Sequence, residues 1–305
     1  MKLSIVIVSW NTCQLLADCL YAVYAHAPAC EFETWVVDNH SADDSVPLVK
    51  TQFPQVKLIE NSKNVGFASA NNQAFRQCSG EYVLLLNPDT KVEPDAVQLL
   101  VDFLDTHPQA GAAGSRLLNS DGTLQPSCYP LPTLSRELWR MFHLDKLYYY
   151  GQYNMAVWDT VAPREVGMLQ GASLLVRRAI LQRIGLMDST YFMYSEEVDL
   201  CYRLRSKGWQ LYWVPQSQVI HYGGQSTKLV APQMFEQLYR GKIQYFRKHH
   251  GSRKASIYKT ILFTAALPRV ILAPLSGLLS SADEKAHKRQ LGYQYQRLLK
   301  TLPGM

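Results

Sequence analysis

The chain lacks the cysteine patterns that bind zinc or build a disulfide framework. Its six cysteines are scattered through 305 residues, and none stands in a Cys-x-x-Cys pair or a Cys/His cluster. Structural zinc sites and small secreted scaffolds depend on such clusters. We therefore expect free thiols, no zinc centre and a protein of the reducing cytoplasm.

Glycine is missing from the loop after the first predicted strand. Residues 3–8 are apolar and largely β-branched, and they are too short for a signal peptide and lack a cleavage site, which favours a strand. The loop that follows is Ser9-Trp10-Asn11-Thr12. Walker and Rossmann proteins bind phosphate through a glycine-rich loop at this place. The absence excludes those loops, argues against a sugar nucleotidyltransferase, and favours a metal ion as the group that neutralises any bound phosphate.

What the first 110 residues do contain is a regular alternation of strands and helices. Apolar runs predict strands at residues 3–8, 32–37, 56–59 and 82–86, with helical patterns between them. This order predicts an α/β fold with a parallel, doubly wound sheet flanked by helices.

Polar side chains follow three of these strands. They are Ser9 and Asn11, then Asp38, then Asn87 and Asp89. Because parallel strands share a direction, all of them should lie at the carboxyl edge of the sheet, where open α/β sheets bind ligands. Asp38 can accept a hydrogen bond from a base or ribose, or cap the next helix. Asp89 can bind a hard cation, or simply form a turn.

The middle of the chain is less regular. An Asp121-Gly122 turn predicts a hairpin between residues 113–118 and 123–125. Residues 126–164 follow, with several prolines and three consecutive tyrosines. A segment this long without a clear pattern favours either a functional lid that carries an acceptor site or a surface excursion packed by its aromatic side chains.

Three acids then fall within four residues, at Glu196, Glu197 and Asp199. A helix that starts near Glu197 would bury Leu200 and Leu204, and acids in a first helical turn are favoured by the helix dipole. Carboxylates this close also suit a general base, because like charges raise one pKa. The pattern alone leaves both interpretations open.

Charge is distributed unevenly along the chain. The residues from Arg240 to the end include 13 lysines and arginines and two acids, whereas residues 1–239 include 18 basic and 23 acidic side chains. We expect a catalytic domain at 1–235 and a basic helical tail at 236–305. A basic tail suits nucleic acid or an anionic membrane surface. No nucleic-acid-binding motif accompanies it, so we expect the membrane and no nucleic acid.

Residues 261–280 are the most apolar part of the tail. They carry a single charge, Arg269, over a length that can just span a bilayer. Pro268, Pro274 and Arg269 favour an interfacial or re-entrant helix pair over a simple span or an ordinary packed helix. This predicts a protein held peripherally at the inner face of the cell membrane.

Several stretches together resemble the inverting family 2 glycosyltransferases, and most closely their bacterial rhamnosyltransferase-like branch. The resemblance implies the α/β GT-A fold, a Rossmann-like, mixed and mostly parallel sheet with flanking helices. The stretches are Ile5-Val6-Ile7-Val8-Ser9-Trp10-Asn11, Val37-Asp38-Asn39-His40-Ser41, Asn64-Val65-Gly66-Phe67-Ala68-Ser69-Ala70-Asn71-Asn72, Leu86-Asn87-Pro88-Asp89, Gly171-Ala172, Tyr194-Ser195-Glu196-Glu197-Val198-Asp199-Leu200-Cys201-Tyr202-Arg203 and His221 before Gly223-Gly224. Three residues depart from the family pattern. Ala74 stands where many members have glycine. Asn87 replaces the first acid of the Asp-x-Asp-type motif, and Glu197 replaces the catalytic Asp.

The resemblance implies a nucleotide-sugar donor and a divalent cation, Mg²⁺ or Mn²⁺. It implies that Asp89 and His221 bind the metal together with the donor diphosphate. It assigns the general base to Glu197, with Glu196 as the neighbouring alternative and Asp199 as the later acid of the motif. The residues assigned to the nucleotide-sugar site are Ser9, Asn11, Asp38, Asn64, Gly66, Asn72, Asn87, Asp89, Gly171 and Ala172.

By the same resemblance, the expected activity is transfer of a sugar with inversion to a hydroxyl of a lipid-linked saccharide, in the synthesis of a cell-surface polysaccharide. The expected donor is dTDP-L-rhamnose, and a UDP-hexose is the alternative. A non-catalytic subunit that binds nucleotide sugars or carbohydrate is a further alternative, against which the intact group of acids argues.

Overall fold

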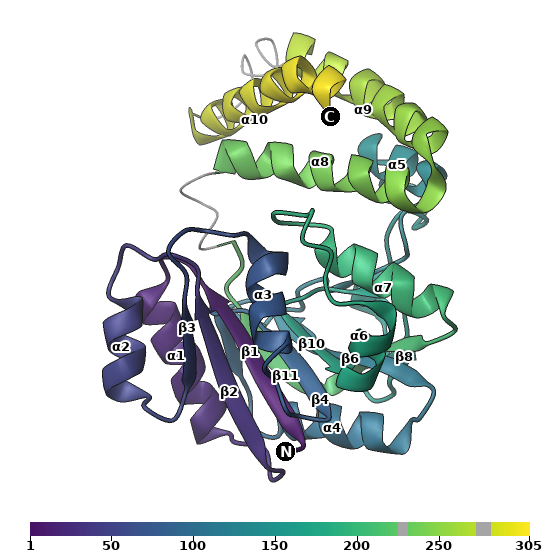
Figure 1. The fold of residues 1–305 in the computed structure, drawn as a ribbon. Coiled ribbons are helices and arrows are strands. Elements are labelled where there is room, and N and C mark those ends of the chain that lie inside the picture. Colours follow the sequence, from purple (N-terminus) through teal and green to yellow (C-terminus); the bar gives the residue numbers. More distant parts are fainter. Residues whose placement is uncertain (225–230, 273–281) are drawn as a thin grey trace. The chain divides into compact units, whose positions relative to one another are not determined.

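The computed structural model describes residues 1–224, 231–272 and 282–305, which form two compact units (Figure 1). The first unit contains residues 1–131, 154–192 and 196–224. The second contains residues 132–153, 193–195, 231–272 and 282–305. Part of the irregular segment 126–164 therefore belongs with the basic tail. The division of the chain at residue 235 stays a prediction.

A mixed sheet forms the centre of the first unit. Its parallel part has the order β3 (Lys57–Glu60), β2 (Phe32–Asp38), β1 (Leu3–Ser9) and β4 (Tyr82–Leu86). Beyond β4 the order continues with β10 (Ser173–Arg177), β6 (Ala110–Leu118), β11 (Gln210–His221) and β5 (Thr90–Val92). β10 is antiparallel to both of its neighbours, and β6 and β11 are parallel. The predicted fold class is confirmed.

Two short strand pairs complete the β-structure of this unit. β8 (Arg164–Glu165) pairs with β11, and β7 (Cys128–Tyr129) pairs with β9 (Met168–Leu169). The predicted hairpin after β6 forms as a short one. The Asn119 N–H donates to the Thr123 carbonyl at 2.8 Å and the Gln125 N–H to the Leu117 carbonyl at 2.9 Å, on either side of a bridge between Leu118 and Leu124.

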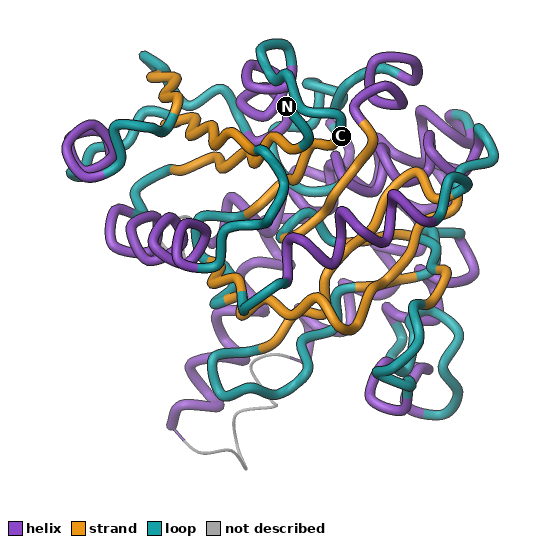
Figure 2. Tube along the Cα trace, turned by 90° about the horizontal axis from the view of Figure 1, so that it is seen from below, coloured by secondary structure: helices purple, strands orange, loops and turns teal. Residues whose placement is uncertain are grey.

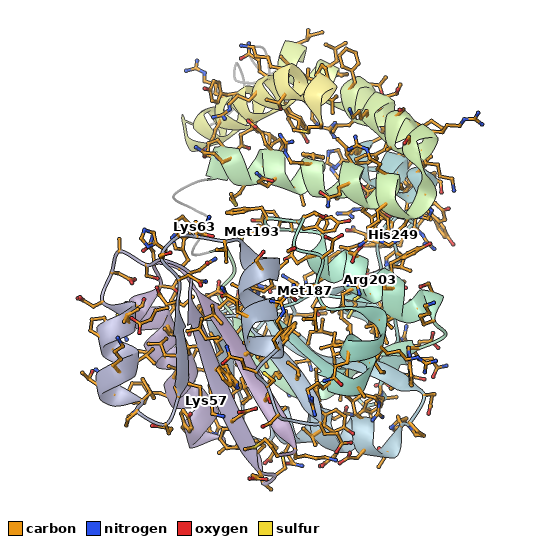
Figure 3. The ribbon with its side chains drawn as sticks, in the orientation of Figure 1. Lys57, Lys63, Met187, Met193, Arg203 and His249 are labelled. Carbon is orange, nitrogen blue, oxygen red and sulfur yellow. The ribbon has the colours of Figure 1, made fainter. Side chains whose placement is uncertain are left out.

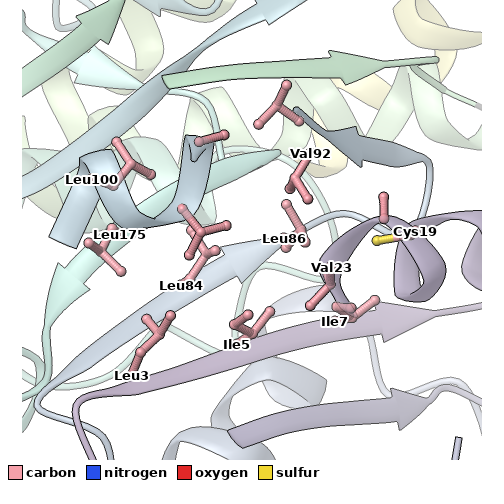
Figure 4. Close-up of a cluster of buried hydrophobic side chains, with 14 of the residues drawn as sticks. Leu3, Ile5, Ile7, Cys19, Val23, Leu84, Leu86, Val92, Leu100 and Leu175 are labelled. Carbon is pink, nitrogen blue, oxygen red and sulfur yellow. The ribbon is translucent and has the colours of Figure 1, made fainter. Parts of the chain in front are cut away.

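Helices pack on the sheet, and Figure 2 shows them in purple around the orange strands. They are α1 (Cys13–Ala25), α2 (Ser45–Gln52), α3 (Phe67–Phe75), α4 (Ala96–Thr106), α6 (Arg178–Ile184) and α7 (Glu196–Ser206), with the short helix η2 (Met155–Val157). Alternate residues of β1, Leu3, Ile5 and Ile7, belong to the same buried cluster as Cys19 and Val23 of α1 (Figure 4). The two-residue period of a strand places these side chains on one face, where burial of apolar surface stabilises the fold.

The second unit is helical. It contains α5 (Leu134–Met141), η1 (Leu144–Lys146), α8 (Ala231–His250), α9 (Ser252–Leu272), α10 (Ala282–Thr301) and η4 (Leu302–Gly304). The sequence pattern did not predict α5, which is short and is preceded by prolines. It begins with a side-chain cap, since Thr133 Oγ1 accepts a hydrogen bond from the Arg136 N–H at 3.2 Å.

A buried carboxylate joins three helices of this unit. Glu137 of α5 accepts hydrogen bonds from Lys242 of α8 at 2.7 Å and from the Tyr258 hydroxyl of α9 at 3.4 Å. Burial alone would raise the pKa of Glu137, but the charges of Lys242 and Arg140 lower it below its ordinary value. The irregular segment is therefore tied to the tail by a paired charge.

The apolar stretch 261–280 is described only in part. Its first residues belong to α9, which contains Pro268, and residues 273–280 lie outside the described part of the chain. Among the helices that the structure describes, none combines the length and the apolar character that a membrane crossing requires.

Candidate active site

The carboxyl ends of β1, β2 and β4 meet at one edge of the sheet, as the sequence predicted. Ser9 is the register partner of Asp38, and Ile7 is the register partner of Leu86. The turns after these strands therefore begin side by side. They bring together residues that are up to 80 positions apart in the sequence.

Asp38 ends β2 with one carboxylate oxygen in use and one available. Its Oδ2 accepts a hydrogen bond from the Ser41 N–H at 2.9 Å. Its Oδ1 is buried and has no hydrogen-bond partner among the described residues. A buried acceptor of this kind costs free energy unless a partner binds it. The position suits a donor group of a ligand, such as the N–H of a base.

Ser9 and Asn11 shape the loops around this acceptor. The Ser9 hydroxyl lies 3.0 Å from the Thr12 hydroxyl. The Asn11 side-chain oxygen accepts a hydrogen bond from the Ala42 N–H at 2.7 Å, and the Asn11 N–H donates to the Ser41 hydroxyl at 3.0 Å. The loop after β1 is thereby fastened to the loop after β2. Both residues lie at the predicted edge, and their side chains support the loops.

The segment that starts at Asn64 is braced in the same way. Asn64 Oδ1 accepts hydrogen bonds from Asn39 Nδ2 at 2.8 Å and from the Gly66 N–H at 3.0 Å. Gly66 has a φ of 84° and lies so close to Phe192 that a Cβ would stand 2.5 Å from the Phe192 carbonyl oxygen. The same carbonyl accepts a hydrogen bond from the Phe67 N–H at 2.8 Å. Glycine is needed here for both the backbone conformation and the close approach.

Asn72 uses its whole side-chain amide on one residue. Its Nδ2 donates to the Met187 carbonyl at 2.7 Å, and its Oδ1 accepts from the Met187 N–H at 3.0 Å. Met187 is labelled in Figure 3. This geometry favours a positioning role for Asn72, because both of its polar atoms bond to Met187 and hold the chain that leads toward α7.

Asp89 and His221 meet at the edge although they are far apart in sequence. β5 pairs with β11 so that Thr90 and His221 are register partners, and the Tyr222 N–H donates to the Asp89 carbonyl at 2.9 Å. His221 Nε2 then lies 3.4 Å from Asp89 Oδ1, and both side chains are almost fully buried. Asn87 Nδ2 lies 3.3 Å from the same nitrogen.

Gln125 orients the His221 ring, and the sequence analysis did not identify it. Gln125 Nε2 donates to the His221 carbonyl at 3.1 Å and to Asn119 Oδ1 at 3.0 Å. Its Oε1 therefore accepts, and it lies 2.6 Å from His221 Nδ1. This network assigns the proton to Nδ1 and leaves the lone pair of Nε2 facing Asp89 and Asn87. The only sequence signal near Gln125 was the preceding Asp121-Gly122 turn.

A divalent cation fits the donor atoms at this point. A carboxylate oxygen and an imidazole nitrogen with its lone pair exposed are both metal ligands, and a histidine ligand commonly donates its other N–H to a neighbouring acceptor, as His221 does to Gln125. In residues 1–224, 231–272 and 282–305, no third His, Cys, Asp or Glu completes a metal-binding group. Further ligands would have to come from a bound substrate.

Gly171 and Ala172 line the same edge on the other side of β4. The Ala172 carbonyl accepts a hydrogen bond from the Asn87 N–H at 3.0 Å, and Ser173 is the register partner of Leu86. A Cβ on Gly171 would lie 3.7 Å from the Glu197 Cβ. The small residues therefore place Glu197 near the turn that carries Asn87.

The three acids of α7 have different environments. Glu196 is buried, and its Oε2 finds no hydrogen-bond partner in the part of the chain that is described. Burial, and then the charge of Glu197, raises the pKa of Glu196 well above its ordinary value. Glu197 is more exposed as a residue than Glu196, although its Oε2 atom is buried. A base has to reach its substrate, so this difference favours Glu197 over Glu196.

Asp199 forms an ion pair with Arg203 of the same helix. It is fully buried, and its Oδ2 lies 2.7 Å from Arg203 Nε. Arg203, labelled in Figure 3, also donates to the carbonyls of Gly185 and Leu186 at 2.8 Å each. The pair fixes the turn before Met187. This arrangement favours a supporting role for Asp199 rather than contact with a substrate.

Residues 4–183 of the chain match the family described as Glycosyl transferase family 2. The chain is 32% identical over 206 residues to an N-acetylglucosaminyl-diphospho-decaprenol L-rhamnosyltransferase of Mycobacterium tuberculosis. This alignment covers 63% of this chain and 67% of the relative. The chain is 24% identical to the rhamnosyltransferase WbbL of Escherichia coli, over 60% of this chain and 70% of the relative.

Solved structures share the fold. A mannosyltransferase from Pyrobaculum calidifontis in complex with GDP-Man and Mn²⁺ matches with a TM-score of 0.59 at 18% identity, over 98% of this chain and 85% of that one. Staphylococcus aureus TarS 1-349 in complex with UDP matches with a TM-score of 0.53 at 14% identity, over 100% of this chain and 92% of that one. The chain therefore belongs to glycosyl transferase family 2, in its rhamnosyltransferase-like branch, and is a glycosyltransferase.

Proposed function

We propose that this enzyme transfers L-rhamnose from dTDP-L-rhamnose, with inversion, to a hydroxyl of a lipid-linked saccharide in the synthesis of a cell-surface polysaccharide. The sugar and the acceptor class are suggested by the mycobacterial relative, whose name states both an L-rhamnosyl transfer and a diphospho-decaprenol acceptor. The observation that carries the proposal is the meeting of Asp89, His221 and the Gly171–Glu197 contact at one sheet edge.

The nucleotide is proposed to bind across the ends of β2 and β4. The free Oδ1 of Asp38 would accept the imide N–H of thymine or uracil, which would satisfy its missing hydrogen bond. Asn11 and Asn64 hold the surrounding loops in place through the hydrogen bonds described above. Asn87, which follows β4 and is partly exposed, would face the donor.

Asp89 and His221 would hold a divalent cation beside the donor diphosphate. Such an ion, when bound, neutralises the charge that develops on the departing diphosphate. Gln125 fixes the His221 ring so that Nε2 remains available as a ligand.

Glu197 is proposed as the general base. Its carboxylate would take the proton of the acceptor hydroxyl, whose oxygen then bonds to the anomeric carbon. The bond from that carbon to the diphosphate oxygen breaks on the opposite face, and the nucleoside diphosphate leaves with the electron pair. Attack from the face opposite the leaving group inverts the anomeric configuration.

The second unit is proposed to contact the membrane that contains the acceptor, on its cytoplasmic side. α9 exposes four large apolar side chains, namely Ile257, Phe263, Leu267 and Ile271. Arg253 and Lys254 are exposed at the start of the same helix. An apolar face next to basic residues suits the interface of an anionic bilayer.

The first test is a thermal-shift panel of dTDP, UDP and GDP, each with and without Mn²⁺. A ligand at a hundred times its Kd stabilises the folded state by about 2.7 kcal/mol, which raises Tm by several degrees. We expect stabilisation by dTDP only with Mn²⁺, and loss of that stabilisation in Asp89→Ala. Asp18→Ala, which removes an exposed carboxylate of α1, is the control and should behave like the wild type.

The other outcomes separate the alternatives. Selective stabilisation by UDP would replace rhamnose with a UDP-hexose as the donor sugar. Nucleotide binding without any sugar transfer to a lipid-linked acceptor would favour a non-catalytic binding subunit. The absence of any shift with any nucleotide would contradict the proposed donor site.

A further inference from the structure

The two residues directly before the acidic helix have an unusual backbone conformation. Tyr194 has a φ of 69° and Ser195 a φ of 72°. Neither is a glycine, and two consecutive left-handed residues of this kind are energetically unfavourable unless their surroundings hold them. The segment Tyr194-Ser195, called the entry turn below, leads by one peptide bond into Glu196 and then Glu197.

What holds the entry turn is a glycine in the middle of α8. A Cβ built on Gly241 would lie 2.8 Å from the Tyr194 carbonyl oxygen, 2.9 Å from Ser195 Oγ and 3.1 Å from Ser195 Cβ. Any side chain would therefore push the turn away. Ser195 and Gly241 are both buried, so the contact is close and dry.

A glycine at position 241 lowers the stability of α8. Glycine in a helix interior is less favourable than alanine, and α8 extends for 20 residues around it. The close packing of the entry turn supplies the physical reason for a glycine at this point. At the other end of the same segment, Phe192 is fixed by Gly66 and Phe67. The chain is thus held by a glycine on each side just before it reaches the acids.

We propose that Gly241 is a positioning residue for the general base. Because it has no side chain, α8 holds the entry turn in its left-handed conformation, and the turn sets the direction in which Glu196 and Glu197 enter α7. This role rests on the proposed function of Glu197. It gives the C-terminal helices a part in catalysis that is separate from membrane contact.

The test compares Gly241→Ala with Gly304→Ala. Gly304 also lies in the second unit, but a Cβ on it would meet nothing within 4 Å. We expect Gly241→Ala to lower kcat by about 10- to 100-fold, the size expected for a misplaced catalytic group, with the donor KM and Mn²⁺-dependent dTDP binding unchanged. Gly304→Ala should match the wild type in all three measurements.

A second variant provides rescue. Ser195→Gly removes two of the three atoms that an alanine at 241 would strike, and glycine adopts positive φ freely. Added to Gly241→Ala, it should restore most of the lost kcat. A purely structural effect of the alanine would instead lower thermal stability and leave kcat of the folded enzyme unchanged, because its Cβ would strike the entry turn.

Two results would overturn the inference. One is wild-type kcat in Gly241→Ala, and the other is a loss of kcat that Ser195→Gly does not restore. Failure of the proposed function would appear differently, as a wild-type enzyme that neither binds dTDP with Mn²⁺ nor transfers sugar.

Discussion

The two ends of β2 each carry a buried carboxylate, and the two carboxylates differ in their hydrogen bonding. At the amino end, Glu33 accepts hydrogen bonds from Lys57 at 2.6 Å, from the Ser4 hydroxyl at 2.6 Å and from the Ser79 N–H at 2.7 Å (Figure 3 labels Lys57). At the carboxyl end of the same strand, Asp38 leaves Oδ1 without a partner among the described residues.

The hydrogen bonds to Glu33 lower its pKa. Burial alone would raise its pKa, but the hydrogen bonds from Lys57, Ser4 and Ser79 outweigh burial and lower the pKa from 4.5 to about 2. The amino edge therefore stabilises the fold with a fully satisfied ion. The carboxyl edge keeps an unsatisfied acceptor, which stability alone does not favour but ligand binding explains.

The same contrast exists within α7. Asp199 is paired with Arg203, whereas Glu196 is buried with an unpartnered oxygen and a raised pKa. Paired carboxylates such as Glu33 and Asp199 support the fold, whereas Asp38 keeps an acceptor oxygen that a ligand can use. Substitutions on the two sides of this division should have opposite consequences, with activity lost on one side and stability lost on the other.

The largest effect is expected at Glu197. Glu197→Gln removes the proposed base and should lower kcat by about a thousandfold, with dTDP binding in the presence of Mn²⁺ unchanged. Glu196→Gln is the matched variant. Because burial and the charge of Glu197 raise the pKa of Glu196 and so favour its neutral form, an isosteric amide should change kcat only slightly. Steady-state kinetics measures kcat in both variants. A larger loss of kcat in Glu196→Gln than in Glu197→Gln would assign the general base to Glu196.

A smaller effect is expected at Gln125. Gln125→Leu removes the acceptor that fixes His221 Nδ1–H and should weaken Mn²⁺ binding in the presence of dTDP by about 10- to 100-fold. Gln125→Glu keeps an oxygen acceptor and should retain more affinity than the leucine variant. Titration of free Mn²⁺ by electron paramagnetic resonance measures both. Equal affinities of the wild type and Gln125→Leu would show that the ring needs no such support.

The smallest effect is expected at the amino edge and concerns stability. Glu33 has a lowered pKa in the folded state, so its contribution is present above pH 4.5 and is lost as the pH falls toward 2. We expect the free energy of unfolding of the wild type to fall through this window by about 2–3 kcal/mol more than that of Glu33→Gln. Urea denaturation at several pH values measures this difference.

The activity of Glu33→Gln provides the control for that prediction. At neutral pH its kcat and donor KM should equal those of the wild type, because Glu33 lies at the edge of the sheet opposite the site. Loss of activity in a variant that remains folded would contradict the division between a supporting edge and a binding edge.

The sequence alone determined the sheet and the edge at which the site lies. Strands such as 82–86 carry their own signal, since apolar runs that end in Asn, Pro and Asp are local patterns. Parallel order then places Asp38 and Asp89 at one edge without further information. The motif resemblance correctly identified the family, and the acids of α7 were visible as a cluster.

Only the tertiary structure decided how those residues are used. The 3.4 Å approach of His221 to Asp89 depends on the pairing of β5 with β11, which joins segments 132 positions apart. The hydrogen bonds of Asn72 to Met187, and the contact of Gly241 with the entry turn, also join segments that are distant in the sequence. A sequence window reports propensity and period, but which atom a polar group meets is fixed by packing between distant segments. The resemblance paired Asp89 with His221, whereas the contacts of Gln125, Asn72 and Gly241 could not be predicted from the sequence.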